Sequence, residues 1–460
     1  MTAASDVSTA LDSSLPDTDY AEVELVRAPA GAPGTELTLS DDGATLRRSV
    51  LPGGVRVITE RVPGLRSASL GMWFGVGSRD EAPGQEGSTH FLEHLLFKGT
   101  PTRDARAIAE AFDTIGGESN AATAKEHTSY YARVQAQDTL LALDVVTDMV
   151  TSSLLAPEEV ETERGVIVSE LAEAADDPAE VAGEAFSRAV FGDDTPLGRP
   201  IGGTAKAVVA VPRDAVWEHY RRTYTSDTLV VAAAGAVDHE EVCARLAADL
   251  AAAGWGGGTG SAPRRRRFER TEPTTPVPHD VTVRRDSEQT HVYIGAPGIP
   301  ARDERRWAMS VFTTILGGGM SSRLFQEVRE KRGLAYTTYA FDHSYAESGA
   351  FGLYAGCAPG DVDEVCRLVV GLWEELAADG VSEVEMARAR GQIRGAMVLG
   401  GEDSLARMGR LGRGEVVTGR LRSMEENLRL LGSVTADDVR QVAADLAQGA
   451  RCRVEVGPRH

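Results

Sequence analysis

Two histidines and a glutamate lie within the five residues His90-Phe91-Leu92-Glu93-His94, and together they could bind and use a metal ion. At about 100° per residue of a helix, His90 and His94 lie about 40° apart, and Glu93 lies about 60° to the other side of His90. Phe91 and Leu92 fall on the opposite side, so the spacing predicts an amphipathic helix with a polar His–Glu–His face. The alternative is a solvated polar face with two incidental histidines. Because the chain has only nine histidines, we favour a metal site.

A third protein ligand is needed, because catalytic zinc sites have three protein ligands and a water molecule. We expect this ligand in a helix that begins near Pro157, since proline suits the first turn of a helix. In this helix Glu163 and Glu170 are seven residues apart, which places them about 20° apart on the helical wheel, at the edge of an apolar stripe. Burying carboxylates there is costly without a cation. We therefore favour a metal-binding role for this helix over the alternative, in which its acidic side chains reach solvent.

With these residues in view, the sequence resembles the insulinase and mitochondrial-processing-peptidase family of zinc endopeptidases. The order His90-x-x-Glu93-His94 is that of the inverzincins. The resemblance extends roughly over residues 45–455. Its further segments are 116–121 (GGESNA), 163–170 (ERGVIVSE), 196–202 (PLGRPIG), 316–325 (LGGGMSSRLF) and 329–336 (REKRGLAY). Together these motifs are far more specific than the metal motif alone.

The resemblance implies a role for each polar residue of the metal motif. His90, His94 and Glu170 would be the ligands of one zinc ion per chain. Glu93 would be the general base that activates water and passes the proton to the leaving amine. Glu163 would orient the ligands rather than bind the metal, as carboxylates next to metal ligands often do.

The resemblance also implies residues that bind substrate. Arg329 and Tyr336 match the pair that the family's second half contributes, and Tyr336 would donate a hydrogen bond to the developing oxyanion. Asn120 and Ala121 would lie on the strand beside the zinc and pair with an extended peptide, which is a β-augmentation mode. The alternative is that Asn120 and Ala121 are ordinary edge-strand residues without a role in substrate binding.

An acidic pair follows the expected third ligand. Glu180 and Glu184 are four residues apart, so they share one helical face. A solvated acidic helix is slightly favoured as the explanation. The other explanation is that the pair holds a cationic substrate side chain, since these positions resemble the acidic ones with which processing peptidases recognise an arginine near the cut.

Composition argues against several classes of protein. The net charge of −21 disfavours general nucleic-acid binding. No run of about 18 apolar residues occurs, so we expect no membrane span. The N-terminus lacks the pattern of a signal or transit peptide, and the four cysteines are scattered without C-x-x-C spacing, which suits a reducing compartment. These features predict a cytoplasmic protein.

The chain divides into a tail, two halves and a linker. Residues 1–40 are rich in Ala, Ser, Asp and Pro, and we expect an acidic, disordered tail. Residues 41–253 would form the zinc-binding catalytic half, and residues 282–458 a second half that carries the Arg/Tyr pair. Residues 254–281 are rich in Gly, Pro and Arg and predict a linker. Its arginines at 264–267 could bind a polyanion, but we favour a solvated linker.

Both halves show runs of strands followed by long helices, as in a degenerate repeat. This pattern predicts an α+β fold in which each of two related halves is an antiparallel sheet backed by helices, and the family that the chain resembles is built in this way. Only the first half contains H-x-x-E-H. We therefore expect the first half alone to bind zinc.

These observations predict a zinc-dependent metalloendopeptidase that cleaves peptides or unfolded segments held as an added strand inside a chamber. The resemblance further implies a homodimer in which one chain's second half faces the zinc of the other. One alternative is a non-catalytic, chamber-forming or core subunit of the same fold, and another is a protein that zinc merely stabilises. Both are disfavoured by Glu93, which neither would need.

Overall fold

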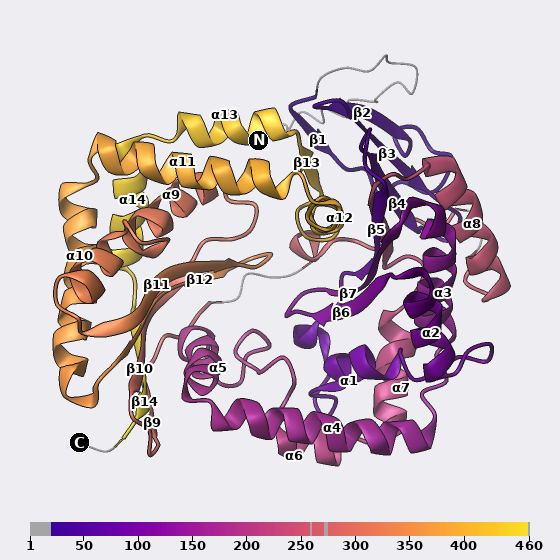
Figure 1. Cartoon of the computed structure of the whole chain (residues 1–460). Coiled ribbons are helices and arrows are strands. Elements are labelled where there is room, and N and C mark those ends of the chain that lie inside the picture. The colour runs from indigo at the N-terminus through magenta and orange to yellow at the C-terminus, as the bar shows by residue number, and fades with distance from the viewer. Residues whose placement is uncertain (1–19, 258–259, 271–274, 459–460) are drawn as a thin grey trace, which may run out of the picture.

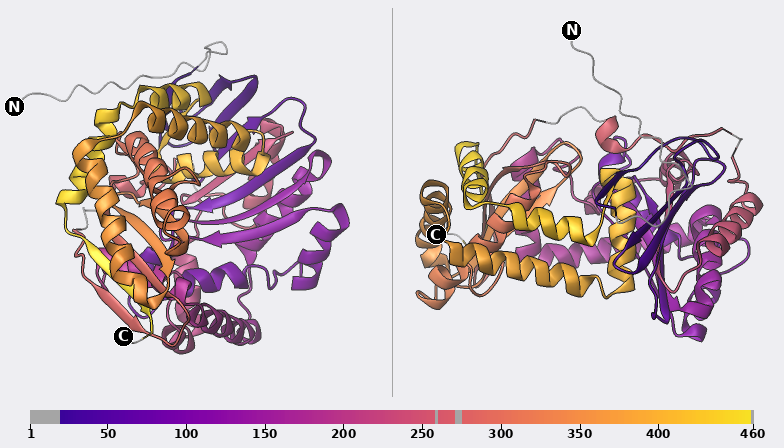
Figure 2. Two further views of the ribbon diagram at one scale, coloured as in Figure 1. Left: turned by 60° about the vertical axis from the view of Figure 1, so that its left-hand side comes forward. Right: turned by 90° about the horizontal axis from the view of Figure 1, so that it is seen from above.

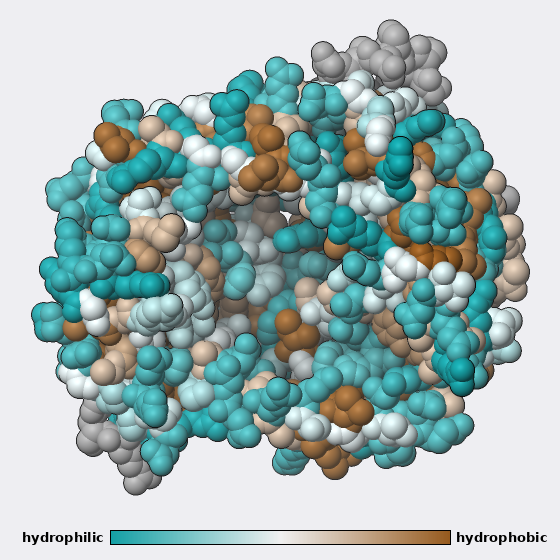
Figure 3. All heavy atoms as spheres, viewed as in Figure 1, coloured by the Kyte–Doolittle hydropathy of each residue, from teal (hydrophilic) through white to brown (hydrophobic). Residues whose placement is uncertain are grey.

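Two β-sheets stand on opposite sides of the molecule, with helices around them and an open region between them (Figure 1). The computed structural model describes residues 20–257, 260–270 and 275–458. The space-filling view shows that the region between the two sides is hollowed (Figure 3). The predicted α+β class with two related halves is confirmed.

The first sheet has seven strands in the order β2-β3-β4-β8-β5-β7-β6. Neighbouring strands are antiparallel except β4 and β8, which are parallel. The strands are β2 (Leu37–Asp41), β3 (Ala44–Val50), β4 (Arg56–Arg61), β5 (Ser67–Phe74), β6 (Glu118–Thr123), β7 (Thr128–Gln135) and β8 (Leu229–Gly235). Strand β6 is therefore an edge of this sheet.

The first half also contributes helices, which pack on its sheet, on one another or on the second half. They are α1 (Ser88–Leu95), α2 (Ala105–Ile115), α3 (Thr139–Ser152), α4 (Pro157–Asp176), α5 (Pro178–Phe191), α6 (Ala205–Ala210), α7 (Arg213–Thr223) and α8 (His239–Ala252), with the short helices η1 (Ser78–Asp80) and η2 (Ala136–Asp138). Strand β5 buries both of its faces. Leu70 and Met72 belong to the core under these helices, whereas Trp73 belongs to a second cluster on the opposite face.

The second sheet has five strands in the order β11-β12-β10-β14-β9. They are β9 (Val281–Arg284), β10 (Thr290–Gly298), β11 (Ala335–Ser344), β12 (Gly349–Cys357) and β14 (Cys452–Gly457). Only β14 and β9 are parallel neighbours. Strand β11 is an edge of this sheet, as β6 is in the first.

The helices of the second half pack on this sheet, on one another or on the first sheet (Figures 1 and 2). They are α9 (Arg306–Gly317), α10 (Val362–Asp379), α11 (Glu383–Gly400), α12 (Ser404–Arg413), α13 (Met424–Ser433) and α14 (Ala436–Gln448). Shorter helical segments are η3 (Arg267–Glu269), η4 (Phe325–Glu330), η5 (Pro359–Asp361) and η6 (Gly414–Thr418).

Each half sends one helix to the other half's sheet. Helix α5 packs against β10 and β14, where Phe186 stacks on Tyr293 with ring centroids 5.3 Å apart. Helix α12 packs against β5 and β8. The close approach of α12 requires glycine at 412, because a Cβ there would lie 2.3 Å from the ring of Trp73. The residues expected to form the two halves, 41–253 and 282–458, therefore pack into each other's sheets.

The expectation of a disordered tail over residues 1–40 is wrong from residue 20 onward. Strand β1 (Glu22–Glu24) pairs with β13 (Arg420–Arg422), and Leu25 and Leu39 are buried. The apolar residues of this segment are few, and strand β1 pairs with a strand far along the chain. Local composition therefore did not reveal the ordered structure. Residues 1–19 lie outside the described residues.

The expectation of solvated arginines in the linker is wrong for Arg266, whereas Arg265 is exposed. Arg266 is 5% exposed and donates a 2.9 Å hydrogen bond to the buried carboxylate of Glu415. Arg48 donates two further hydrogen bonds to it, of 2.8 and 3.0 Å, and Arg56 lies 3.6 Å away. Burial alone would raise the pKa of Glu415, but the arginines hold it well below its usual range. This cluster ties the linker and η6 to the first sheet.

Glu415→Gln is expected to lower the free energy of unfolding by about 3 kcal/mol, because it leaves buried arginines without a compensating charge. Chemical denaturation followed by circular dichroism measures this loss. Glu22→Gln is the control, since Glu22 pairs with Arg422 at a more exposed site and should cost less than about 1 kcal/mol. Equal losses in both variants would contradict a special role for the buried cluster.

Two further sequence expectations concern the environment of the chain. Within the described ranges, no single helix has the length and apolar character needed to cross a membrane, and only a bent pair, 136–152 with 157–176, meets the combined criteria. All four cysteines are unpaired and buried.

Candidate metal centre

Helix α1 carries the two histidines of the motif and is anchored by its apolar face. Phe91, Leu92 and Leu95 are fully buried in the core of the first half. The helix starts after Gly87, which has a φ of 90° and no side chain to cap it. Helix α1 packs against α7, α4 and β6, so its polar face is held between the sheet edge and α4.

The start of α1 is capped by a glutamate that sequence reasoning missed. Glu81 accepts hydrogen bonds from the backbone N–H groups of Gly87 (2.9 Å) and Thr89 (2.7 Å). It is 5% exposed, and burial raises its pKa to about 7 despite these hydrogen bonds. Thr89 Oγ1 also lies 3.1 Å from Nε2 of buried His219. A capping carboxylate outside the usual N-cap position has no local sequence signal, so only the fold reveals it.

The structure brings together the three residues that were predicted to bind metal. One potential ligand atom each from His90, His94 and Glu170 lies within 4.8 Å of the others, and no other such group occurs among the described residues. Nε2 of His94 is 3.4 Å from Oε2 of Glu170, and the two imidazole centroids are 4.8 Å apart. Glu170 comes from α4, which packs on α1.

The surroundings of the two imidazoles suit metal binding. Nδ1 of His94 lies 3.0 Å from Oε2 of Glu163, so it can donate its proton there and leave Nε2 with a free lone pair. Glu163 is itself buried and 2.6 Å from Lys98 Nζ. Burial, and then the neighbouring His94, lower the pKa of His90. Its buried Nδ1 has no hydrogen-bond partner among the described residues, so no protein hydrogen bond occupies this nitrogen.

Glu93 lies beside the ligand group without belonging to it. Its side chain is half-buried, and its charge acts on His90. It is thus an extra carboxylate next to a three-ligand set, which is the position that a general base requires.

Asn120 and Ala121 lie on the edge strand β6, next to α1. They pair with Tyr131 and Tyr130 of β7, and β6 has no strand on its other side among the described residues. Asn120 is exposed and Ala121 is buried. An unpaired edge of this kind can accept an extended peptide as a further strand.

Arg329 and Tyr336 contact each other but not the ligand group. Arg329 donates a 2.9 Å hydrogen bond to the carbonyl of Tyr336, and its guanidinium lies 4.1 Å from the centroid of the Tyr336 ring. The side chain of Tyr336 is 73% exposed. Over the described ranges, every side-chain contact of this pair is with the second half. The pair is therefore available to a peptide or to another surface.

Glu180 and Glu184 lie on exposed positions of α5. Burial raises the pKa of Glu184, whereas the positive charges of Arg188 and Lys125 lower it. Burial lowers the pKa of Lys125 to about 8, and the negative charge of Glu184 partly offsets this shift. Glu184 thus already faces a cation of the β6–β7 turn, while Glu180 makes no ion pair with any residue that the structure describes.

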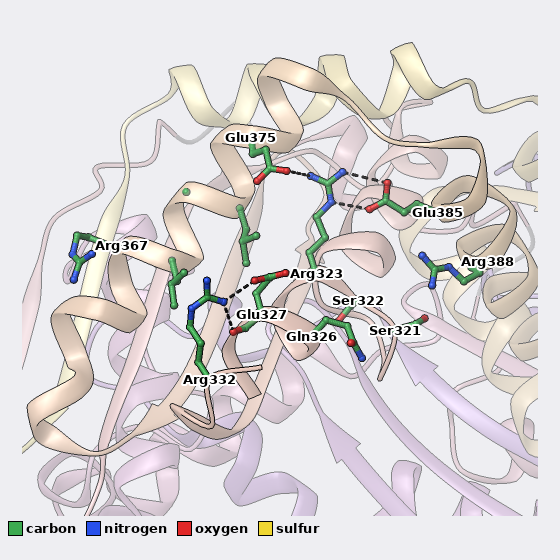
Figure 4. Close-up of a pocket in the computed structure, with 13 residues that line it drawn as sticks. Ser321, Ser322, Arg323, Gln326, Glu327, Arg332, Arg367, Glu375, Glu385 and Arg388 are labelled. Carbon is green, nitrogen blue, oxygen red and sulfur yellow. Dashed lines mark hydrogen bonds and ion pairs between the residues drawn. The ribbon is translucent and has the colours of Figure 1, made fainter. Parts of the chain in front are cut away.

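A large cavity of about 860 Å³ lies apart from the ligand group, in the second half between η4, α10 and α11. Figure 4 shows Arg323 held by Glu375 and Glu385, Arg332 held by Glu327, and Arg388 directed into the cavity. It contains none of the predicted metal ligands. Its size therefore does not identify it as the chemical centre.

Two family models match large parts of the chain. Residues 56–205 match the family described as insulinase (peptidase family M16), and residues 210–393 match the peptidase M16 inactive domain. An uncharacterized zinc protease of Streptomyces coelicolor is 46% identical over 423 residues, covering 90% of each chain. One from Mycobacterium tuberculosis is 46% identical over 91% of this chain and 95% of its own. One from Bacillus subtilis is 33% identical over 87% of this chain and 95% of its own.

Two solved structures share the fold. A peptidase M16 inactive domain from Pseudomonas fluorescens has a TM-score of 0.80 and 20% identity, and covers 90% of this chain and 98% of its own. A protease from Helicobacter pylori has a TM-score of 0.79 and 19% identity, and covers 89% of this chain and 99% of its own. At these identities the likeness concerns the fold alone.

Proposed function

The chain belongs to the insulinase family (peptidase family M16), and we propose that it is a zinc-dependent endopeptidase. The observation that carries the proposal is the convergence of His90, His94 and Glu170 with a further carboxylate, Glu93, beside them. The zinc-protease names of the relatives agree with it. A structural zinc site would not need Glu93.

The residues of the site divide the chemistry among themselves. His90, His94 and Glu170 would hold one zinc ion, which supplies a Lewis acid and lowers the pKa of water. Glu93 takes the proton from the attacking water and delivers it to the leaving nitrogen. Glu163 keeps the proton of His94 on Nδ1, so that Nε2 stays free.

The substrate is held as an added strand on β6, within the hollow between the two halves (Figure 3). Main-chain hydrogen bonds to Asn120 and Ala121 would hold a peptide largely independently of its sequence. This mode suits peptides and unfolded segments, because a folded protein does not offer an extended strand. A cytosolic location is part of the proposal, since the four cysteines are unpaired.

Incubation with a mixed peptide library, followed by mass spectrometry, tests the proposed function. The purified chain should produce internal cuts that a zinc chelator abolishes and added zinc restores. The alternative is a non-catalytic subunit of the same fold. It would be favoured by zinc-loaded protein that leaves every peptide intact, alone and as an oligomer.

Arg329 and Tyr336 do not contact the ligand group of their own chain, and this leads to a prediction about assembly. We propose a homodimer in which the second half of one chain completes the zinc site of its partner. Glu93→Gln and Tyr336→Phe should each be inactive alone. After random exchange about half of the dimers are mixed, and one of the two sites in each mixed dimer is intact. Mixing the two variants should therefore restore up to about a quarter of the activity. Activity of the mixture is compared with that of each variant after subunit exchange has been verified by native mass spectrometry. Absence of restored activity would favour a site completed within one chain.

A preference for basic peptides is expected from the acidic pair on α5. Peptides with Arg or Lys within a few residues before the cut should be cleaved faster than matched neutral peptides, through charge-assisted hydrogen bonds to Glu180 and Glu184. Salt should weaken the preference, as should the double variant Glu180→Gln, Glu184→Gln. The measurement is kcat/KM for both peptides at two ionic strengths. Equal cleavage at low salt would rule the preference out.

A further inference from the structure

A second cavity, of about 480 Å³, is lined by residues of the second half, between positions 301 and 427. It is lined by the segment before and at the start of α9, by the end of β11, and by the α12–η6–β13 region. Six of its lining residues are arginines and two are carboxylates, Glu304 and Asp342. The cavity is therefore strongly basic within a chain whose net charge is −21.

Four of the six arginines are already engaged by carboxylates. These ion pairs are Arg302 with Glu24, Arg410 with Glu60, Arg420 with Glu24 and Glu304, and Arg422 with Glu22 and Glu304. These ion pairs fix the walls of the cavity, and they include one of its two carboxylates, Glu304. The remaining carboxylate, Asp342, is within ion-pair distance of no arginine in the part of the chain that the structure describes.

Three donors of the cavity remain unused. Arg306 and Arg413 make no side-chain hydrogen bond or ion pair with any residue in the ranges 20–257, 260–270 and 275–458. The guanidinium of Arg306 lies 5.0 Å from the centroid of the Trp307 ring, and the buried Nε1 of Trp307 has no hydrogen-bond partner among the residues that the structure describes. Two guanidinium groups and an indole N–H lining one cavity provide the donors that a carboxylate accepts from.

Arg413, one of the unused donors, lies near the turn that follows the edge strand β6. Arg413 follows Gly412, which packs on the ring of Trp73, and that ring is 5.5 Å from the imidazole of His127 in the β6–β7 turn. Burial lowers the pKa of His127 to about 4, and the charge of Arg413 adds to this effect. Figure 1 shows α12, which ends at Arg413, at the junction of the two halves.

A peptide added to β6 that continues past the end of the strand would run toward the turn that contains His127. From Asn120 to Thr123, at the end of β6, the strand extends roughly 10 Å at about 3.3 Å per residue. We propose that the cavity binds an acidic side chain of the substrate, roughly three to five residues from the scissile bond, through Arg306, Arg413 and Trp307 Nε1. This proposal rests on the proposed endopeptidase function and on strand addition at β6.

Matched peptides that differ only by Glu or Gln at these positions test the proposal. The wild-type chain should cleave the Glu peptide with a kcat/KM roughly 10-fold higher. Arg306→Gln and Arg413→Gln should each bring this ratio toward one. Arg106→Gln is the charge-matched control, because Arg106 lies on α2 with its side chain 84% exposed, and it should keep the wild-type ratio. A ratio near one in the wild type, or an equal fall in Arg106→Gln, would overturn the proposal.

Binding to the Glu93→Gln variant separates this proposal from the proposed function. Fluorescence anisotropy should show tighter binding of the Glu peptide, and the preference should be lost when Arg413→Gln is added. Such selective binding without cleavage by the wild type would support the cavity site and contradict the endopeptidase. Cleavage of both peptides without any Glu preference would support the endopeptidase and contradict the cavity site. Inorganic phosphate that binds the wild type but not Arg413→Gln, with no peptide preference, would assign the cavity to a small anion and overturn the peptide site.

Discussion

Glu93→Gln is expected to keep its zinc and to lose turnover by at least about 10²-fold, the usual scale for a positioned general base. The amide preserves the size of the side chain and its place next to the ligand group, but it cannot accept the proton of water. The three ligands are untouched, so metal content should stay at about one equivalent per chain. The expected fall is in kcat, with a smaller effect on KM, because the lost interaction belongs to the transition state.

Metal analysis and peptide hydrolysis on the same preparation check this outcome. Glu86→Gln provides the matched control, since Glu86 lies close to α1 in sequence but is not part of the ligand group. It should retain both zinc and activity. Near wild-type turnover of Glu93→Gln would remove the proposed mechanism, and loss of zinc would show that Glu93 is a ligand instead.

Removal of a metal ligand is expected to abolish both zinc binding and activity. His90→Ala and Glu170→Gln each leave two protein ligands, which is too few for a tightly held catalytic zinc. Glu163→Gln should have a milder effect, a loss of about 10- to 100-fold in metal affinity or activity, because it touches His94 and not the metal. The two glutamates share one helix, so this comparison separates the two roles within α4.

Zinc titration against a chromogenic chelator, together with activity at saturating zinc, measures these differences. The order expected for metal affinity is wild type, then Glu163→Gln, then Glu170→Gln. Full zinc occupancy and activity in Glu170→Gln would mean that the third ligand is wrongly assigned. The reverse order of the two glutamates would transfer the ligand role to Glu163.

Much of the candidate site could be predicted from the sequence because its geometry is local. His90, Glu93 and His94 lie within two turns of α1, and Glu163 and Glu170 lie two turns apart on α4. The helical period alone therefore places each set on one face. The apolar residues between them predicted which face enters the core, and Phe91 and Leu92 are indeed buried. The α+β class followed in the same way, from strand and helix periodicities along each half.

Tertiary structure alone decided which distant residues complete these elements. Arg48 and Glu415 are 367 residues apart, yet they form the buried cluster that also holds Arg266. Glu81 caps α1 from outside the helix, and the two halves exchange α5 and α12. Such contacts depend on how the sheets and helices pack, whereas a sequence pattern reports only the few residues on either side of each position.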